Sequence, residues 1–232
     1  MNSLLNNSRI AGFLYFLLAL AGPVRIVYIP SKLFVHGNPS ATAGNIAAHE
    51  SLFRFGMASD LFVGAIVIFV ALALYRLFRG VDRNLAVLVV ILGGIIPAAL
   101  YFGNVLNDAA ALALARGYDF LAAFSQPQRD SLVMLFMHLH GMGFTAGEVF
   151  YGLWLLPLAV LTYRSNFLPR FLGIWLFLNG LAYLVLSLTG FLFPQYEDAL
   201  SNVLFPLLSG EVVFFLWLLV RGARERQPMA ES

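Results

Sequence analysis

Six long apolar runs dominate the sequence and restrict what it can fold into. Each run approaches or exceeds the ~20 residues that a helix needs to cross a bilayer. The runs are Ile10–Ile29, Phe55–Tyr75, Leu85–Leu106, Leu132–Leu161, Phe171–Phe193 and Val203–Val220. Because lipid offers no hydrogen-bond partners to a backbone, these runs must be helical, and the alternation typical of a membrane-spanning strand is absent. Only 11% of the residues are charged, whereas a soluble domain carries about 25%.

The expected architecture is an all-α integral membrane bundle of six transmembrane helices. A chain of 232 residues suits a single transmembrane domain over residues 1–232. The expected spans are residues 10–29, 52–76, 85–113, 129–162, 170–193 and 201–221. Ala19-Leu20-Ala21 resembles a signal-peptidase site, but the apolar run continues to Ile29 and Pro23 lies just past the site. An uncleaved first span is therefore favoured over a signal peptide.

The distribution of lysine and arginine predicts the orientation of the chain. Cytoplasmic loops of membrane proteins carry an excess of these residues. With the N-terminus inside, the cytoplasmic segments hold Arg9, Arg76, Arg79, Arg83, Arg164, Arg170, Arg221, Arg224 and Arg226. The outer loops then hold only Lys32, Arg116 and Arg129. This asymmetry predicts that both termini are cytoplasmic.

Several classes of function are excluded or disfavoured by composition. The chain has no cysteine, which excludes disulfides and thiol chemistry. Its net charge of +2 is small and gives no reason to expect nucleic acid as a partner. No Gly-rich phosphate loop, HExxH metal motif or nucleophile elbow is present. We expect no cofactor; the expected partners are the lipid bilayer and a small-molecule or ion ligand, and the oligomeric state is left open.

Ionisable side chains within or at the edges of the apolar runs indicate where a site would lie. A charge at the centre of a bilayer costs roughly 3 kcal/mol, so such residues usually face a bundle interior or a wet cavity. They are Arg25, Glu50, Arg54, Asp60, Asp108, His138, His140, Glu148 and Glu211.

Three of these charges are expected to lie at one depth. At ~1.5 Å per residue, Arg25, Asp60 and Glu148 are each about 24 Å from the cytoplasmic arginine of their helix. Ser187 falls near the same level, and Glu211 lies deeper, at about 15 Å. We expect Arg25 to bridge the two carboxylates with its planar guanidinium, and Glu211 is a candidate proton-coupling carboxyl. The alternative is that these charged residues have only a structural role and stabilise helix packing through ion pairs.

A second polar layer is expected at the outer surface. Glu50 and Arg54 form a pair in the favourable i,i+4 order. Asn104, Asn107 and Asp108 share one face of the third helix. These residues are either part of a binding site or solvated helix ends, which contribute little to stability.

The histidines of the outer layer suggest a metal site. Zinc in a catalytic site needs about three protein ligands and an open position. His49, together with His138 or His140 and with Asp60 or Asp108, could supply them. Residues two apart point to opposite sides of a regular helix, so His138 and His140 cannot both bind one ion unless that helix is distorted.

Several short motifs along the chain resemble motifs of a known protein family. They are Arg9–Tyr15, Leu52–Asp60, Asp82–Ala86, Tyr163–Gly173 and Gly210-Glu211. Over residues 8–222 the chain resembles the bacterial membrane family catalogued as domain of unknown function 4386. The resemblance implies six membrane helices in the bacterial inner (plasma) membrane and no established activity. It also implies that Arg54, Asp60 and Glu211 belong to the pattern that the family shares.

The function that these observations favour is binding or translocation of a small polar or ionic ligand at an outward-opening charged cavity. In that reading Arg25 holds an anionic group or pairs with Asp60 and Glu148. One alternative is a membrane-embedded, metal-dependent hydrolase with a His/Asp site at the outer face. Another is a non-catalytic interaction subunit whose buried charges form a structural network.

Overall fold

Six helical segments in the structure, a computed structural model that describes residues 2–224, are long and apolar enough to cross a membrane. They are Ser3–Pro23, Glu50–Phe78, Arg83–Arg116, Gln126–Arg164, Arg170–Leu192 and Pro194–Val220. Over the described range no residue is in a strand. The all-α, six-helix membrane fold expected from the sequence is therefore confirmed, while the cytoplasmic location of the termini stays a prediction.

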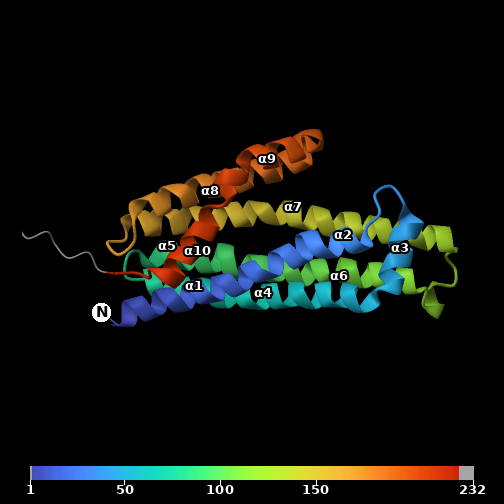
Figure 1. The fold of residues 1–232 in the computed structure, drawn as a ribbon, viewed down its shortest axis with the longest axis horizontal. Coiled ribbons are helices and arrows are strands. Elements are labelled where there is room, and N and C mark those ends of the chain that lie inside the picture. Colours follow the sequence, from blue (N-terminus) through green and yellow to red (C-terminus); the bar gives the residue numbers. More distant parts are fainter. Residues whose placement is uncertain (1, 225–232) are drawn as a thin grey trace, which may run out of the picture. The chain divides into compact units, whose positions relative to one another are not determined.

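The helical elements are labelled in chain order in Figure 1. They are α1 (Asn2–Pro23), η1 (Val24–Tyr28), α2 (Ile29–Leu33), α3 (Pro39–Ala48), α4 (Glu50–Phe78), α5 (Arg83–Val90), η2 (Ile91–Ile95), α6 (Ile96–Arg116), η3 (Asp119–Leu121), α7 (Gln126–Arg164), α8 (Arg170–Leu192), η4 (Pro194–Tyr196), α9 (Glu197–Leu208) and α10 (Gly210–Val220).

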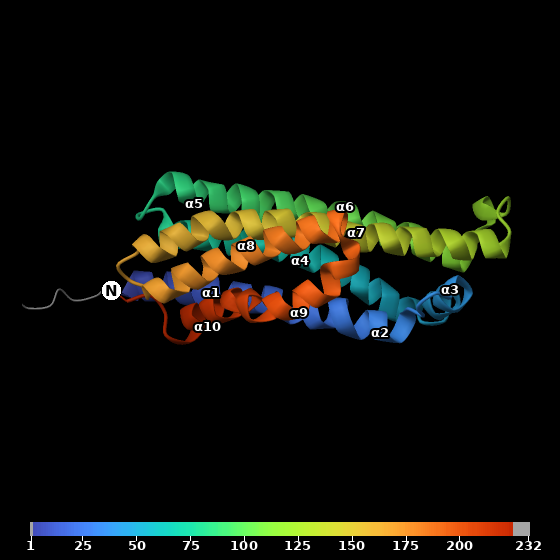
Figure 2. The ribbon, with the colours of Figure 1, turned by 90° about the horizontal axis from the view of Figure 1, so that it is seen from above.

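The chain divides into two compact units, each with its own apolar core. Unit 1 comprises Met1–Leu17, Ile66–Pro97 and Thr145–Ser232, and unit 2 comprises Leu18–Ala65 and Ala98–Phe144. In unit 1, α8 contacts both α9 and α10 (Figures 1 and 2). In unit 2, α2 contacts α3, which runs across the direction of α2 (Figure 1). The buried core of unit 2 is formed by Ile29, Leu33, Ala43, Ile46, Phe53, Ala111, Leu112, Leu114 and Val133.

Two π-helical turns interrupt the spans, and each is followed by a proline. In η1 the Ile29 N–H donates to the carbonyl of Val24, and in η2 the Ile96 N–H donates to that of Ile91. Pro30 and Pro97 come directly after these two donors. A proline inside a helix has no N–H and crowds the preceding turn, so the turn before it widens. The helical backbone therefore continues beyond the first span, through Pro30 to the end of α2, whereas the span expected from the sequence ended at residue 29.

The ends of two helices are set by side chains that cap the backbone. The Asp82 carboxylate accepts hydrogen bonds from the N–H groups of Asn84 and Leu85, at 3.0 and 3.1 Å, and so starts α5. At the start of α7 the Gln128 side chain accepts from the Ser125 N–H at 2.8 Å. Both contacts satisfy backbone donors that a helix leaves unpaired at its N-terminus.

The last span is broken, whereas the sequence suggested one continuous helix over 201–221. The chain changes direction between α9 and α10 (Figure 1). Pro206 lies inside α9, and the Ser209 hydroxyl donates to the Pro206 carbonyl at 2.6 Å. That carbonyl would otherwise accept the next helical N–H, so the side chain competes with the helix at this point. The Glu211 N–H at the start of α10 is capped by Asn179 Oδ1 at 3.0 Å.

Candidate functional site

Four polar side chains from four separate elements meet in the interior of unit 2. Arg25 comes from η1, Asp60 from α4, Asp108 from α6 and His140 from α7. Arg25 Nε donates to Asp60 Oδ2 at 2.7 Å, and Arg25 Nη2 donates to Asp108 Oδ2, also at 2.7 Å. The same Nη2 lies 2.7 Å from His140 Nε2. We call these four residues the Arg25 cluster.

The cluster is closed off from solvent. The exposed fractions are 6% for Arg25, 2% for Asp60, 1% for Asp108 and 8% for His140. Charges removed from water in this way are stable only when they are paired and hydrogen-bonded. In the Arg25 cluster the guanidinium is both paired and hydrogen-bonded, whereas one carboxylate oxygen, Asp108 Oδ1, is not hydrogen-bonded with good geometry to any described residue.

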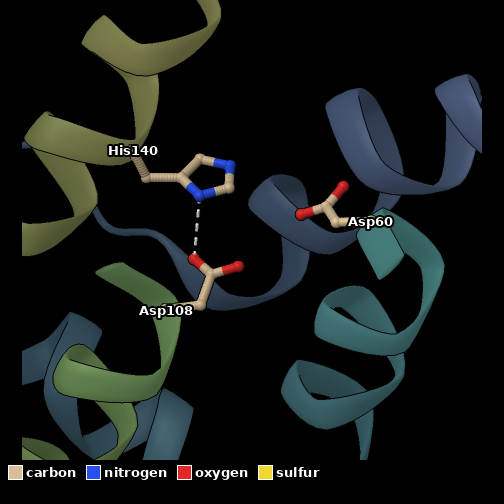
Figure 3. A group of neighbouring side chains, drawn as sticks. All are labelled: Asp60, Asp108 and His140. Carbon is tan, nitrogen blue, oxygen red and sulfur yellow. Dashed lines mark ion pairs between the residues drawn. The ribbon is translucent and has the colours of Figure 1, made fainter. Parts of the chain in front are cut away.

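Asp108 and His140 face one another across the cluster (Figure 3). His140 Nδ1 lies 3.1 Å from Asp108 Oδ1, although within residues 2–224 this buried oxygen has no hydrogen bond of good geometry. Arg25 Nη2 also lies 3.3 Å from His140 Nδ1, and because a guanidinium can only donate, the ring nitrogen that it contacts must be unprotonated. With a neutral imidazole, one guanidinium faces two carboxylates. Both carboxylates contact the guanidinium, but the cluster then carries one net negative charge.

Neighbouring residues hold α6, α7 and η1 in place around the cluster. Asn104 Nδ2 donates to the His140 carbonyl at 3.0 Å, and Asn107 Nδ2 donates to Asn104 Oδ1 at 2.9 Å. At Gly143 an added Cβ would lie 2.6 Å from Asn104 Oδ1, so a larger residue there would displace the Asn104 side chain. At Gly56 an added Cβ would lie 2.8 Å from Ile29 Cδ1 and 3.8 Å from the Arg25 stem. Small residues thus allow close helix packing, as is usual in membranes.

Asp60, Asp108 and His140 have the spacing of a metal-ligand set. One ligand atom from each lies within 4.8 Å of the others. All three residues are buried, unlike the exposed acidic groups that often lie together without a metal. Two carboxylates and an imidazole suit divalent ions such as zinc, manganese and iron.

The Arg25 cluster joins residues that the sequence placed in two separate layers. Arg25 and Asp60 pair as expected, but Asp108 and His140, assigned to the outer layer, contact the same guanidinium. Residue counting treats each helix as straight and parallel to the others. Helix tilt and the widened turn at η1 shift residues along the bundle by amounts that such counting does not include.

The remaining outer-layer charges form an exposed network. Glu50 accepts from Arg54 Nε at 2.6 Å and from Arg116 Nη1 at 2.5 Å. The i,i+4 pair is therefore present, and the Arg54 side chain is 54% exposed. Exposed pairs of this kind contribute about 0–1 kcal/mol.

The three histidines named from the sequence lie in different surroundings. His49 is exposed and ends α3, where its N–H donates to the Asn45 carbonyl. His138 is exposed and lines an open pocket of about 460 Å³ together with His36, Met134 and Met137. His140 alone belongs to the metal-ligand set, and metal binding itself stays a prediction.

The other predicted site residues belong to unit 1. Glu211 accepts a hydrogen bond from the Tyr15 hydroxyl, and its backbone is capped by Asn179, whose Nδ2 is buried without a partner. Ser187 is buried and donates to the Thr145 carbonyl at 2.6 Å. Glu148 is half-buried on α7, and its predicted association with Arg25 and Asp60 stays a prediction. Neither Tyr15 nor Asn179 was predicted as a site residue, because nothing in the sequence pairs them with Glu211.

A match to a protein-family model identifies the family of this chain. The model for a domain of unknown function (DUF4386) matches residues 10–222. The chain belongs to the DUF4386 family. This DUF4386 chain is also 27% identical over 155 residues to an uncharacterized protein of Archaeoglobus fulgidus, a match covering 67% of the chain and 76% of the relative. No solved structure matches it.

Proposed function

We propose that this DUF4386 protein resides in the bacterial inner membrane and binds and translocates a small cation at the Arg25 cluster. The observation that carries the proposal is the charge balance of the cluster: two buried carboxylates face one guanidinium, and within residues 2–224 Asp108 Oδ1 has no hydrogen bond of good geometry. A buried, uncompensated negative charge is costly and attracts a cation. Intramembrane ionisable groups commonly mark ion or substrate pathways.

A cation is favoured over the anionic ligand that the sequence also allowed. Arg25 is the positive group that would bind an anion, but its Nε and Nη2 already donate to Asp60 and Asp108. An anion would have to displace a buried carboxylate from its partner. Breaking a buried ion pair costs roughly 3–5 kcal/mol.

Thermal melting of the purified protein in detergent tests the proposal. Chlorides of sodium, potassium, magnesium, calcium, manganese and zinc are added one at a time at constant ionic strength. A cation at 100 times its Kd should stabilise the folded state by about 2.7 kcal/mol. Asp108→Asn should abolish the shift, whereas Glu50→Gln, a carboxyl-to-amide change in the exposed network, should preserve it. If no cation raises the melting temperature of the wild type, the proposal is wrong.

A metal-dependent hydrolase is the second candidate function. It is favoured by the grouping of Asp60, Asp108 and His140, because catalytic zinc sites typically hold three protein ligands and one water. Hydrolysis of ester or amide substrates that depends on added zinc and is lost in His140→Ala would select this candidate. A cluster that only fixes helix packing would give neither a cation-dependent melting shift nor hydrolysis.

A further inference from the structure

We propose that the cation is a divalent transition-metal ion and that Arg25 competes with it for the same ligands. This inference rests on the proposed function, since it names the ligand of the Arg25 cluster. The inference adds a role for Arg25. Its guanidinium occupies the place of the metal and offsets the charge of the carboxylates when no metal is bound, and it leaves the cluster when the metal binds.

The donor atoms of the cluster select the class of ion. An imidazole nitrogen suits zinc, iron, nickel and copper but is a poor ligand for sodium, magnesium or calcium, which prefer oxygen. The carboxylates of Asp60 and Asp108 complete a mixed nitrogen and oxygen set with His140, and the three ligand atoms lie within 4.8 Å of one another. Such a set fits zinc, manganese or ferrous iron with open positions left for water.

The guanidinium of Arg25 contacts all three of these ligands. Its nitrogens lie 2.7 Å from an oxygen of Asp60, from an oxygen of Asp108 and from His140 Nε2. A metal bound to the same three side chains would lie 2.0–2.2 Å from each ligand atom. If the metal takes the atoms that Arg25 contacts, the guanidinium and the metal exclude one another, and their binding is competitive.

Charge balance favours replacement of the Arg25 guanidinium by a divalent metal ion. With Arg25 in place, the two carboxylates leave one negative charge uncompensated. A divalent ion in place of the guanidinium would neutralise both carboxylates. His140 would then direct a ring nitrogen to the metal in place of accepting from Arg25.

The backbone at Arg25 has the features of a segment that can move. Arg25 lies in the π-helical turn η1, between Pro23 and Pro30. π-Helical turns frequently occur at functional sites. A long arginine side chain can also extend toward the membrane interface when it leaves a buried position.

The test compares metal affinity in variants of the tag-free, full-length protein in detergent. Manganese binding is followed by electron paramagnetic resonance, and zinc is added as a competitor. Wild type should bind manganese, and zinc should displace it. Arg25→Gln should bind more than roughly tenfold tighter, because the metal no longer breaks charge-assisted hydrogen bonds before it binds. Asp108→Asn and His140→Ala should bind at least roughly tenfold more weakly, since each removes a ligand.

Matched controls separate the cluster from non-specific binding. Arg54→Gln removes an exposed arginine, and His138→Ala removes an exposed histidine two positions from His140. Neither should change the affinity for manganese. If Arg25→Gln proves too unstable to purify, Arg25→Lys keeps the positive charge but loses the planar fork, and it should still bind manganese tighter than wild type.

Each outcome decides between the two proposals. Equal manganese affinity in wild type and in the Arg25 variants would refute the competition. Unchanged affinity in Asp108→Asn and His140→Ala would place the metal elsewhere. Stabilisation by sodium or potassium alone, lost in Asp108→Asn, would refute the transition-metal inference and leave the proposed cation site intact.

Discussion

Arg25 and Arg54 show how differently two arginines of one membrane protein are used. The Arg25 side chain is 6% exposed and donates to two carboxylates from different helices. The Arg54 side chain is 54% exposed and pairs with Glu50 one turn earlier on the same helix. Removing Arg25 leaves two buried carboxylates without a cation, whereas removing Arg54 leaves Glu50 with Arg116 and with access to water.

We expect Arg25→Ala to destabilise the protein by roughly 3–5 kcal/mol, the cost of breaking a buried ion pair. Arg54→Ala should cost at most about 1 kcal/mol, as exposed pairs do. Thermal melting of both variants in the same detergent measures the difference. A larger loss of stability in Arg54→Ala than in Arg25→Ala would contradict the burial assigned to these two residues.

The π-helical turns are the most distinctive elements of the fold. In η2, Gly93 and Gly94 are buried and the chain passes close to α7 of the same unit. A Cβ on Gly93 would lie 2.1 Å from Cε3 of the Trp154 indole, whose side chain is itself buried. Pro97 widens the turn, and the glycine allows the indole to lie against its backbone. Nothing in the sequence pairs Gly93 with the tryptophan that requires it.

We expect Gly93→Ala to destabilise the protein by about 1–3 kcal/mol, because overpacking a dense core forces neighbouring groups to shift. Gly103→Ala, on the exposed side of α6, is the matched control because nothing lies within 4 Å of its added Cβ. It should be neutral or stabilise by up to about 1 kcal/mol through helix propensity. Melting temperatures that fall equally in both variants would argue against the close contact with Trp154.

For the molecule as a whole, the central expectation is its orientation in the membrane. Six spans place both termini on the same side, and the arginine asymmetry assigns that side to the cytoplasm. The same orientation makes the segment before α4 an outer loop.

Reporter fusions after Ser232 and within Gly37–Gly44 check this orientation in intact cells. A reporter active only in the cytoplasm should be active at the first site and inactive at the second, and a periplasmic reporter should give the opposite result. Fusions that report the same side at both positions would exclude six spans.

The sequence by itself determined the class of the protein. Long apolar runs admit only helices in lipid, so the number of spans follows from composition and length. A local signal was also readable: Glu50 pairs with Arg54, because this contact joins residues one helical turn apart. The sequence also marked the charges that are costly in a membrane, among them Arg25 and Asp60.

Only the tertiary structure decided which of those charges meet. Asp108 and His140 contact Arg25 because of how α6, α7 and η1 pack, and residue counting along straight helices assigned them to another layer. The break between α9 and α10 likewise depends on one hydroxyl competing for one carbonyl, at Ser209 and Pro206. The physical reason is that hydrophobicity acts on whole helices without direction, whereas a hydrogen bond or an ion pair depends on positions to within a few tenths of an ångström.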